Sequence, residues 1–130
     1  MKLDQAFGIH EQALKLRGYR SEVLASNLAN ADTPGYKARD MDFAQVLRGE
    51  QHKAPQLTAT NARHISTGGP AIAQGVPLAY RIPLQPSTDG NTVDAEQEQM
   101  AFSRNAMEYQ ATLGFIDGRI KGLMSAIRGD

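Results

Sequence analysis

Hydrophobic residues follow helical spacing at both ends of this chain and strand-like alternation in its middle. Over residues 4–28 the apolar positions form two neighbouring stripes of a helix, and the first stripe holds Phe7, Leu14 and Leu28. Together the stripes make an apolar face wider than a two-stranded coiled-coil seam, which suits contact with more than one partner helix. The same pattern also fits an ordinary bundle helix.

The sharpest pattern lies in the C-terminal third, where apolar residues recur at alternating spacings of four and three. They are Phe102, Ala106, Tyr109, Leu113, Ile116, Ile120, Leu123 and Ile127. Such a heptad seam is typical of helices that pack side by side. Asp94 with Gln97 predicts the helix start, and Gly129 predicts its end. At 1.5 Å per residue this helix is ~50 Å long, which favours a bundle of several chains over a small globule.

The first helix is expected to end at a turn rich in asparagine. The residues of this motif are Asn27, Asn30, Thr33, Pro34, Gly35 and Tyr36. Pro34 fixes φ at the second position of a type II turn, and Gly35 accepts the positive φ of the third. Asn30 is a candidate C-cap, because asparagine tolerates the left-handed conformation. The motif is either a plain helix-ending turn or a device that also sets the direction of the outgoing chain.

Residues 37–92 predict an irregular insert with two ordered pieces. Asp42 resembles an N-cap for a short helix, with Phe43 and Val46 on one face and Gly49 as its end. Further along, apolar residues alternate strictly at Val76, Leu78, Tyr80, Ile82 and Leu84. Two prolines within this run exclude a central strand, because each removes a ladder donor. We expect either an edge strand over its own domain or an extended arm that docks on a neighbour.

These elements predict a mainly α fold. Long N- and C-terminal helices pack as a coiled-coil-like inner domain, made of residues 1–36 (helix and turn) and 93–130 (helix). The insert at 37–92 carries the short helix and the extended edge strand.

Composition narrows the classes of function. The chain has 130 residues with 14 basic and 14 acidic side chains, which gives no electrostatic case for nucleic acid or an anionic membrane. The absence of cysteine excludes disulfides and thiolate metal sites. No run approaches the ~20 apolar residues of a membrane helix, and no signal peptide is visible. We expect the protein to stay in the cytosol or to leave without a cleaved signal.

Candidate catalytic groups do not form a site. His10, His52 and His64 lack the spacing of metal ligands. Asp40 and Asp42 could form an acidic pair, but capping explains Asp42 more simply. The glycines at 68 and 69 lack the spacing and the lysine of a phosphate loop. We therefore predict no enzyme activity, no cofactor, no metal and no small-molecule substrate.

Two blocks of sequence resemble a known family. The run 25–40, followed by Asp42 and Phe43, contains Asn-x-x-Asn-x-x-Thr-Pro-Gly-Tyr. It is similar to the flagellar basal-body rod and hook proteins. The C-terminal blocks 89–94, 109–110 and 118–124 look like those of the proximal rod proteins and depart from the FlgC pattern. The region 50–86 matches less well, as is typical of a variable insert.

The resemblance implies a structural subunit of the bacterial flagellar rod. In this family the terminal helices pair into an inner domain, and many copies stack into a helical tube that transmits torque and encloses the export channel. The implied partners are other copies, FlgC-, FlgF- and FlgG-like rod proteins, a FliE-like adaptor, the membrane ring and the type III export apparatus. The implied location is the rod within the periplasmic space. The alternatives are another axial protein such as FlgC, or a stand-alone helical adaptor or secretion chaperone.

A lone subunit is expected to leave its apolar stripes partly covered, with its terminal helices frayed. Assembly then completes each subunit with helices of its neighbours, through heterologous contacts that do not close. Tyr36 and the arm at 76–84 are the candidates for docking between subunits.

Overall fold

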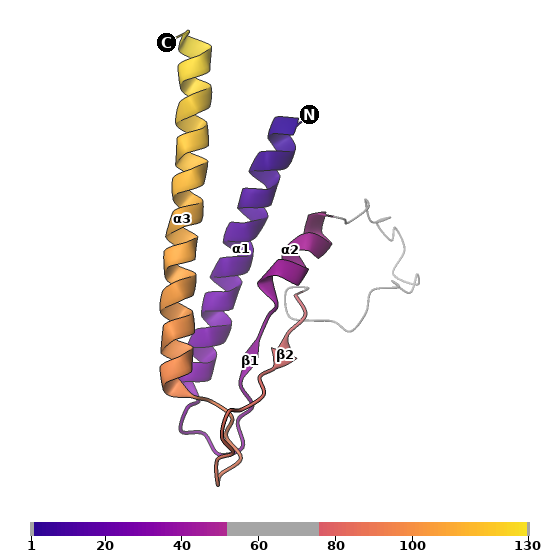
Figure 1. Ribbon diagram of the computed structural model, residues 1–130, viewed down its shortest axis with the longest axis vertical. Helices are drawn as coiled ribbons and strands as arrows, with labels where there is room; N and C mark the ends of the chain where they lie inside the picture. The colour runs from indigo at the N-terminus through magenta and orange to yellow at the C-terminus, as the bar shows by residue number, and fades with distance from the viewer. Residues whose placement is uncertain (1, 52–75, 130) are drawn as a thin grey trace, which may run out of the picture.

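A computed structural model describes residues 2–51 and 76–129 of the chain. In these ranges the elements follow in the order α1 (Lys2–Ala29), β1 (Arg39–Asp40), α2 (Phe43–Gln51), β2 (Ala79–Tyr80) and α3 (Ala95–Arg128). Helices α1 and α3 run antiparallel side by side, and α2 and the strands lie on the other side of α1 (Figure 1). The predicted fold class, with long terminal helices packed together, is confirmed.

The ends of α3 follow the capping signals of the sequence. The Asp94 side chain accepts a hydrogen bond from the Gln97 N–H, with 3.2 Å between Oδ1 and N. Gly129 closes the helix in the left-handed conformation, with φ of 76°, and its N–H donates to the Ser125 carbonyl. Both predicted ends are confirmed, so the long heptad pattern is one continuous helix.

The start of α2 is also as predicted, but its end is not. The Asp42 carboxylate accepts from the Gln45 N–H at 3.1 Å. The helix then continues through Gly49 to Gln51, so the predicted stop at Gly49 is wrong. Glycine weakens a helix interior by only about 1 kcal/mol relative to alanine and does not end it unless the chain turns there.

Strands β1 and β2 form an antiparallel pair in which Arg39 faces Tyr80 and Asp40 faces Ala79. The Arg81 N–H extends the ladder by donating to the Ala38 carbonyl at 2.9 Å. The strand covers only two residues of the alternating run. Val76 is buried, whereas the later apolar members of the run, Tyr80, Ile82 and Leu84, are exposed.

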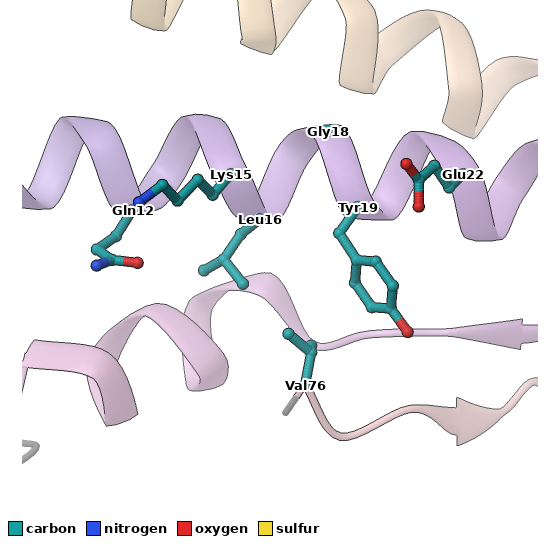
Figure 2. Close-up of a pocket in the computed structure, with 7 residues that line it drawn as sticks. All are labelled: Gln12, Lys15, Leu16, Gly18, Tyr19, Glu22 and Val76. Atoms are coloured by element: carbon teal, nitrogen blue, oxygen red, sulfur yellow. The ribbon is translucent and has the colours of Figure 1, made fainter. Parts of the chain in front are cut away.

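The apolar core is small and lies between α1, α2 and the segment that leads into β2. Its buried members are Leu16, Met41, Val46 and Val76, with Tyr19, Phe43, Leu47 and Leu78 packed against them. Figure 2 shows Leu16, Tyr19 and Val76 meeting beneath α1. On the opposite side of α1, the buried residues of α3 are the polar Glu98, Asn105 and Thr112. The buried positions of α3 therefore form a polar line, while the apolar cluster lies on the other side of α1.

Candidate assembly interface

The turn that follows α1 has the geometry that its sequence predicts. The Tyr36 N–H donates to the Thr33 carbonyl at 3.2 Å, and Gly35 has φ of 72°, which together make a type II turn. Asn30, the first residue after α1, donates from its side chain to the Ser26 carbonyl at 2.8 Å. The Thr33 hydroxyl donates to the Asn30 side-chain oxygen at 3.1 Å. These contacts tie the turn to the last turn of the helix.

Asn27 is fully buried, and its side chain makes the backbone hydrogen bonds to β1 that a neighbouring strand would otherwise make. Its Nδ2 donates to the Arg39 carbonyl at 2.7 Å, and its Oδ1 accepts from the Arg39 N–H at 3.1 Å. The same Nδ2 also donates to the Glu98 carboxylate at 3.1 Å. One carboxamide thus satisfies both backbone groups of Arg39 and closes the outer edge of β1, which would otherwise be open to pairing.

The segment before α3 is fastened to the same turn. The Gly35 N–H donates to the Asp89 carbonyl at 2.9 Å, and the Thr92 N–H donates to the Tyr36 carbonyl at 3.0 Å. The buried Asn91 points its Nδ2 at three carbonyl oxygens of the turn, at 2.9 to 3.0 Å. Sequence reasoning gave Asn91 no role. Its signal was the Asp-Gly-Asn run, which is typical of a turn that needs side-chain support.

Four charged residues form what we call the ionic latch: Arg20, Asp40, Arg81 and Glu98. Arg20 binds both oxygens of Asp40 at 3.0 Å, and Arg81 binds Oδ2 of Asp40 at 2.7 Å. The other arm of the Arg81 guanidinium pairs with Glu98, whose side chain is fully buried. The latch joins α1, β1, the chain after β2 and α3.

The charges of the latch stabilise one another. Burial by itself raises the pKa of Asp40, but hydrogen bonds from Arg20, the Met41 N–H and Arg81 hold that pKa below its usual value. The hydrogen bond to Asp40 in turn raises the pKa of Arg20. Sequence reasoning considered Asp40 only as half of an acidic pair with Asp42. The sequence signal was Arg81, the only charged residue in the run 76–84.

Polar contacts also fix the pairing of α1 with α3. Asn105 donates to the Arg17 carbonyl at 2.8 Å and to the Ser21 hydroxyl at 2.7 Å. Arg17 pairs with Glu108, and its guanidinium lies 4.0 Å from the ring centroid of Phe43. A polar residue at a buried heptad position specifies register at some cost in stability. Asn105, together with the contact of Glu98 to Asn27, therefore sets the register of the helix pair, whereas the buried Thr112 donates to the Glu108 carbonyl of its own helix.

The described residues carry no sign of catalysis. A shallow depression of about 380 Å³ is lined by seven residues from α1 and the chain before β2 (Figure 2). Its only ionisable side chains besides Tyr19 are Lys15 and Glu22. Among the described residues there is no cluster of histidine and carboxylate groups that could hold a metal, and no helix is long and apolar enough to cross a membrane. His52 and His64 lie outside the described residues.

Comparison with known proteins gives full-length matches. A family model described as flagella basal body rod protein matches residues 8–37, which contain most of α1 and the turn. A flagellar basal body rod protein FlgB of Aeromonas hydrophila is 48% identical and covers 100% of this chain and 98% of that protein. The FlgB proteins of Escherichia coli and Cereibacter sphaeroides are 46% and 51% identical, and the matches cover 98% and 95% of this chain and 96% and 94% of those proteins.

The chain belongs to the flagellar basal-body rod protein family. It is a structural subunit of the rod and not an enzyme, as the sequence predicted. The FlgB name that these relatives share favours the main interpretation over the FlgC-like and adaptor alternatives.

The apolar seam of α3 in this rod protein lies beside the polar line that faces α1. Tyr109, Ile116 and Leu123 are half-buried. The remaining large members of the seam are more open: Phe102 is 38% exposed, Leu113 44%, Ile120 45% and Ile127 85%. Ala106 is exposed, and on α1 the three predicted packing residues, Phe7, Leu14 and Leu28, are half-buried. The structure thus leaves one side of the seam open in a single copy.

The turn motif and the arm of this rod protein differ in how far their side chains are buried. Asn27 is buried, Asn30 and Tyr36 are half-buried, and Thr33, Pro34 and Gly35 are exposed at the tip of the turn. In the arm at 76–84, Val76 and Leu78 pack toward the core, and the other three apolar residues point outward. The motif is accounted for by contacts within the chain. In the outer part of the arm, the Arg39 guanidinium lies 5.7 Å from the Tyr80 ring centroid, and Ile82 and Leu84 are 88% and 79% exposed.

Proposed function

We propose that this rod subunit packs with further copies of itself, and with FlgC-, FlgF- and FlgG-like proteins, into a helical tube that transmits torque and encloses the export channel. The observation that carries this proposal is the exposure of the α3 seam. Ile127 at its end is 85% exposed, whereas the buried line of the same helix is polar. Burying apolar surface is worth roughly 25 cal/mol per Å², so helices of neighbouring copies gain by covering this side.

The tube requires that the open seam of one copy meet a different surface of the next. Because α1 and α3 already bind each other through polar contacts, the open side of the seam does not serve to hold the subunit together. Contacts between two different surfaces generate rings or open filaments, and only self-complementary patches close into dimers. Tyr36 and the outer arm residues are the further surfaces that we assign to contacts between subunits.

We also propose a location and a route. The subunit sits in the rod within the periplasmic space, beside a FliE-like adaptor and the membrane ring, and it leaves the cell through the flagellar type III exporter without a cleaved signal. The cysteine-free composition supports this route, because a chain that forms no disulfides before export stays easy to unfold.

The experiment replaces one seam residue in a flagellated bacterium that lacks its own proximal rod subunit. Ile127→Asp places a charge near the C-terminal end of α3, which extends beyond the end of α1 (Figure 1). Because Ile127 is 85% exposed, the substitution should change the stability of the isolated subunit little. We expect the variant to be made and folded but absent from isolated basal bodies, with loss of motility.

The matched control is Ala126→Asp, which adds the same charge one residue away and about 100° around the helix. Ala126 is exposed as well. The control is expected to enter basal bodies. Normal assembly of the Ile127→Asp variant would show that the seam does not bind neighbouring helices. A stable, closed dimer of the purified wild-type chain would instead favour the adaptor alternative.

A further inference from the structure

The pair of strands β1 and β2 has two outer edges, and the structure closes only one of them. On β1, the Arg39 N–H and carbonyl point away from β2, and both bind the Asn27 side chain, at 3.1 and 2.7 Å. On β2, no group within residues 2–51 and 76–129 makes a hydrogen bond to the outer edge. An unpaired strand edge is a template for the backbone of another chain, and proteins usually block it.

The register of the strand pair shows which backbone groups the open edge offers. Arg39 faces Tyr80, and in an antiparallel pair two facing residues direct their backbone groups either both inward or both outward. The N–H and carbonyl of Tyr80 therefore point away from β1. The Arg81 N–H points inward, to the Ala38 carbonyl, so the N–H of Ile82 in the extended chain points outward again. The open edge thus presents two donors and one acceptor.

The two prolines of the arm leave these outward groups intact. Pro77 and Pro83 occupy the same alternate positions as Ala79 and Arg81, which face β1. Proline blocks a strand edge only where it removes an N–H that points out of that edge. The prolines therefore limit the pairing with β1 and leave the outer edge of β2 able to pair.

The open edge is both accessible and held in place. Tyr80 is 69% exposed and Ile82 is 88% exposed. Between them, the Arg81 side chain is bound to Asp40 and Glu98 in the ionic latch. A partner strand therefore meets a backbone that is already ordered, which lowers the entropic cost of binding.

A charge beside the edge indicates what the partner strand carries. The Arg39 guanidinium lies 5.7 Å from the Tyr80 ring centroid, and the ion pairs found among the described residues do not include Arg39. A residue opposite Tyr80 on an added strand shares this face of the sheet, and a carboxylate there reaches the guanidinium. Residues 82–88 are uncharged, which favours apolar side chains on the rest of the partner strand.

The free strand edges decide between a second copy and a different protein. Among the described residues β1 has no free edge, so a second copy offers only its own β2 edge. Two identical edges that pair are self-complementary and close into a dimer. Copies that follow one another along a helical tube meet through different surfaces, which leaves the β2 edge of each copy open to another chain.

We propose that an extended segment of a different protein adds to the outer edge of β2 as a third strand. Its backbone pairs with Tyr80 and Ile82, one of its carboxylates binds Arg39, and its other side chains at the edge are apolar. This inference rests on the proposed function, because the helical tube is what rules out pairing between two β2 edges. It names the surface by which the subunit binds a neighbour of another kind.

The backbone contact is tested by comparing Ile82→Pro with Ile82→Ala in a flagellated bacterium that lacks its own proximal rod subunit. Both variants remove an exposed side chain, but only proline removes the N–H at position 82, which has no partner within the described residues. We expect several-fold less of the Ile82→Pro chain in isolated basal bodies, with the same circular dichroism for both purified subunits. Equal incorporation of the two variants, or an equal loss of both, would overturn the proposal.

Cross-linking with the N–H in place identifies the partner, and it remains decisive if Ile82→Pro does not fold. The photo-reactive p-benzoylphenylalanine replaces Tyr80 in cells, and isolated basal bodies are irradiated. We expect a product that joins this chain to a different protein, within a segment that contains aspartate or glutamate. A product within one chain or between two copies, a segment without a carboxylate, or no product at all would overturn the docking.

The wild-type chain in the same preparations checks the proposed function separately. If the chain is present in basal bodies and the product is absent, the chain is still a rod subunit and the assigned contact is wrong. If the wild-type chain is itself absent from basal bodies, the proposed function is wrong.

Discussion

At Asn27, a single carboxamide meets the backbone of β1, the Glu98 carboxylate and, at 3.4 Å, the Tyr36 hydroxyl. Replacing it by alanine leaves the Arg39 backbone groups unpaired and removes a donor from a buried carboxylate. Leaving a buried polar group unsatisfied costs about 1–3 kcal/mol. We expect Asn27→Ala to lower the free energy of unfolding by about 3 kcal/mol, measured by urea denaturation.

Ser26 provides the control for this prediction. Its hydroxyl lies 3.3 Å from the Tyr36 hydroxyl at an exposed site, where a lost hydrogen bond matters little. Ser26→Ala should change the free energy of unfolding by about 0.5 kcal/mol or less. Equal decreases in the free energy of unfolding for the two variants would mean that the contacts of Asn27 with Arg39 and Glu98 do not stabilise the fold.

Asp40 makes the latch sensitive to acid. Its pKa is lowered in the folded protein, so its charged form stabilises the fold at every pH above the ordinary carboxyl value, about 3.9. As the pH falls through that value and then through the lower folded pKa, the folded chain must take up a proton and the stabilisation is lost. We expect the difference in unfolding free energy between wild type and Asp40→Asn to shrink from neutral pH to about pH 3. A difference that stays constant with pH would contradict this role.

Only part of this residue-level picture could be predicted from the sequence. The caps at Asp42 and Asp94 and the turn at Gly35 follow from local rules, and the structure confirms them. The contacts of Asn27 and Asp40 join residues far apart in the chain, such as Asn27 with Glu98 and Asp40 with Arg81. No local pattern specifies such pairs, because the fold must first bring the segments together.

The effect of replacing a glycine by alanine depends on where that glycine lies in the structure. Gly118 lies in the exposed interior of the helix, where an added Cβ meets no neighbour within 4 Å. Gly118→Ala is therefore expected to raise the stability of the isolated subunit by about 1 kcal/mol. The thermal midpoint measured by circular dichroism should rise by about 3 °C.

Gly35 gives the opposite expectation for the same change. It has φ of 72°, which an alanine side chain rarely adopts. Gly35→Ala should lower the thermal midpoint, because strain in the turn outweighs the reduced freedom of the unfolded chain. Two shifts of the same sign would contradict this account of the turn and of α3.

At the scale of elements, the spacing of hydrophobic residues predicted the positions of the helices. For the arm at 76–84 it predicted the extended chain but not which apolar residues are buried. The alternation at 76–84 was correct as a pattern, but Arg81 occupies the inner side and turns the later apolar residues outward. Apolar periodicity does not reveal the polar line on α3, because the residues of that line are not apolar. Glu98, Asn105 and Thr112 also recur every seven residues, which is readable in the sequence once polar heptad positions are considered.

At the scale of the whole molecule, α1 lies in the middle, with α3 on one side and the core with α2 and the strands on the other (Figure 1). Sequence patterns could not show which side of each helix faces inward, because an apolar stripe suits contact within a copy or between copies. The structure distinguishes the two. Polar contacts join α1 to α3, and large apolar side chains of α3 remain exposed. Polar contacts within the copy and exposed apolar side chains on α3 together support a subunit whose apolar surface is covered by neighbouring copies.

The most direct measurement compares methionine oxidation in the isolated subunit and in assembled basal bodies. Met124 borders the seam between Ile120 and Ile127 and is 45% exposed, whereas Met41 is 5% exposed and serves as an internal control. Peptide mass spectrometry follows sulfoxide formation at each residue during mild peroxide treatment. We predict that Met124 oxidises quickly in the isolated subunit and slowly in basal bodies, while Met41 is slow in both. Equally fast oxidation of Met124 in assembled rods would contradict the central claim that neighbouring copies cover the exposed seam of α3.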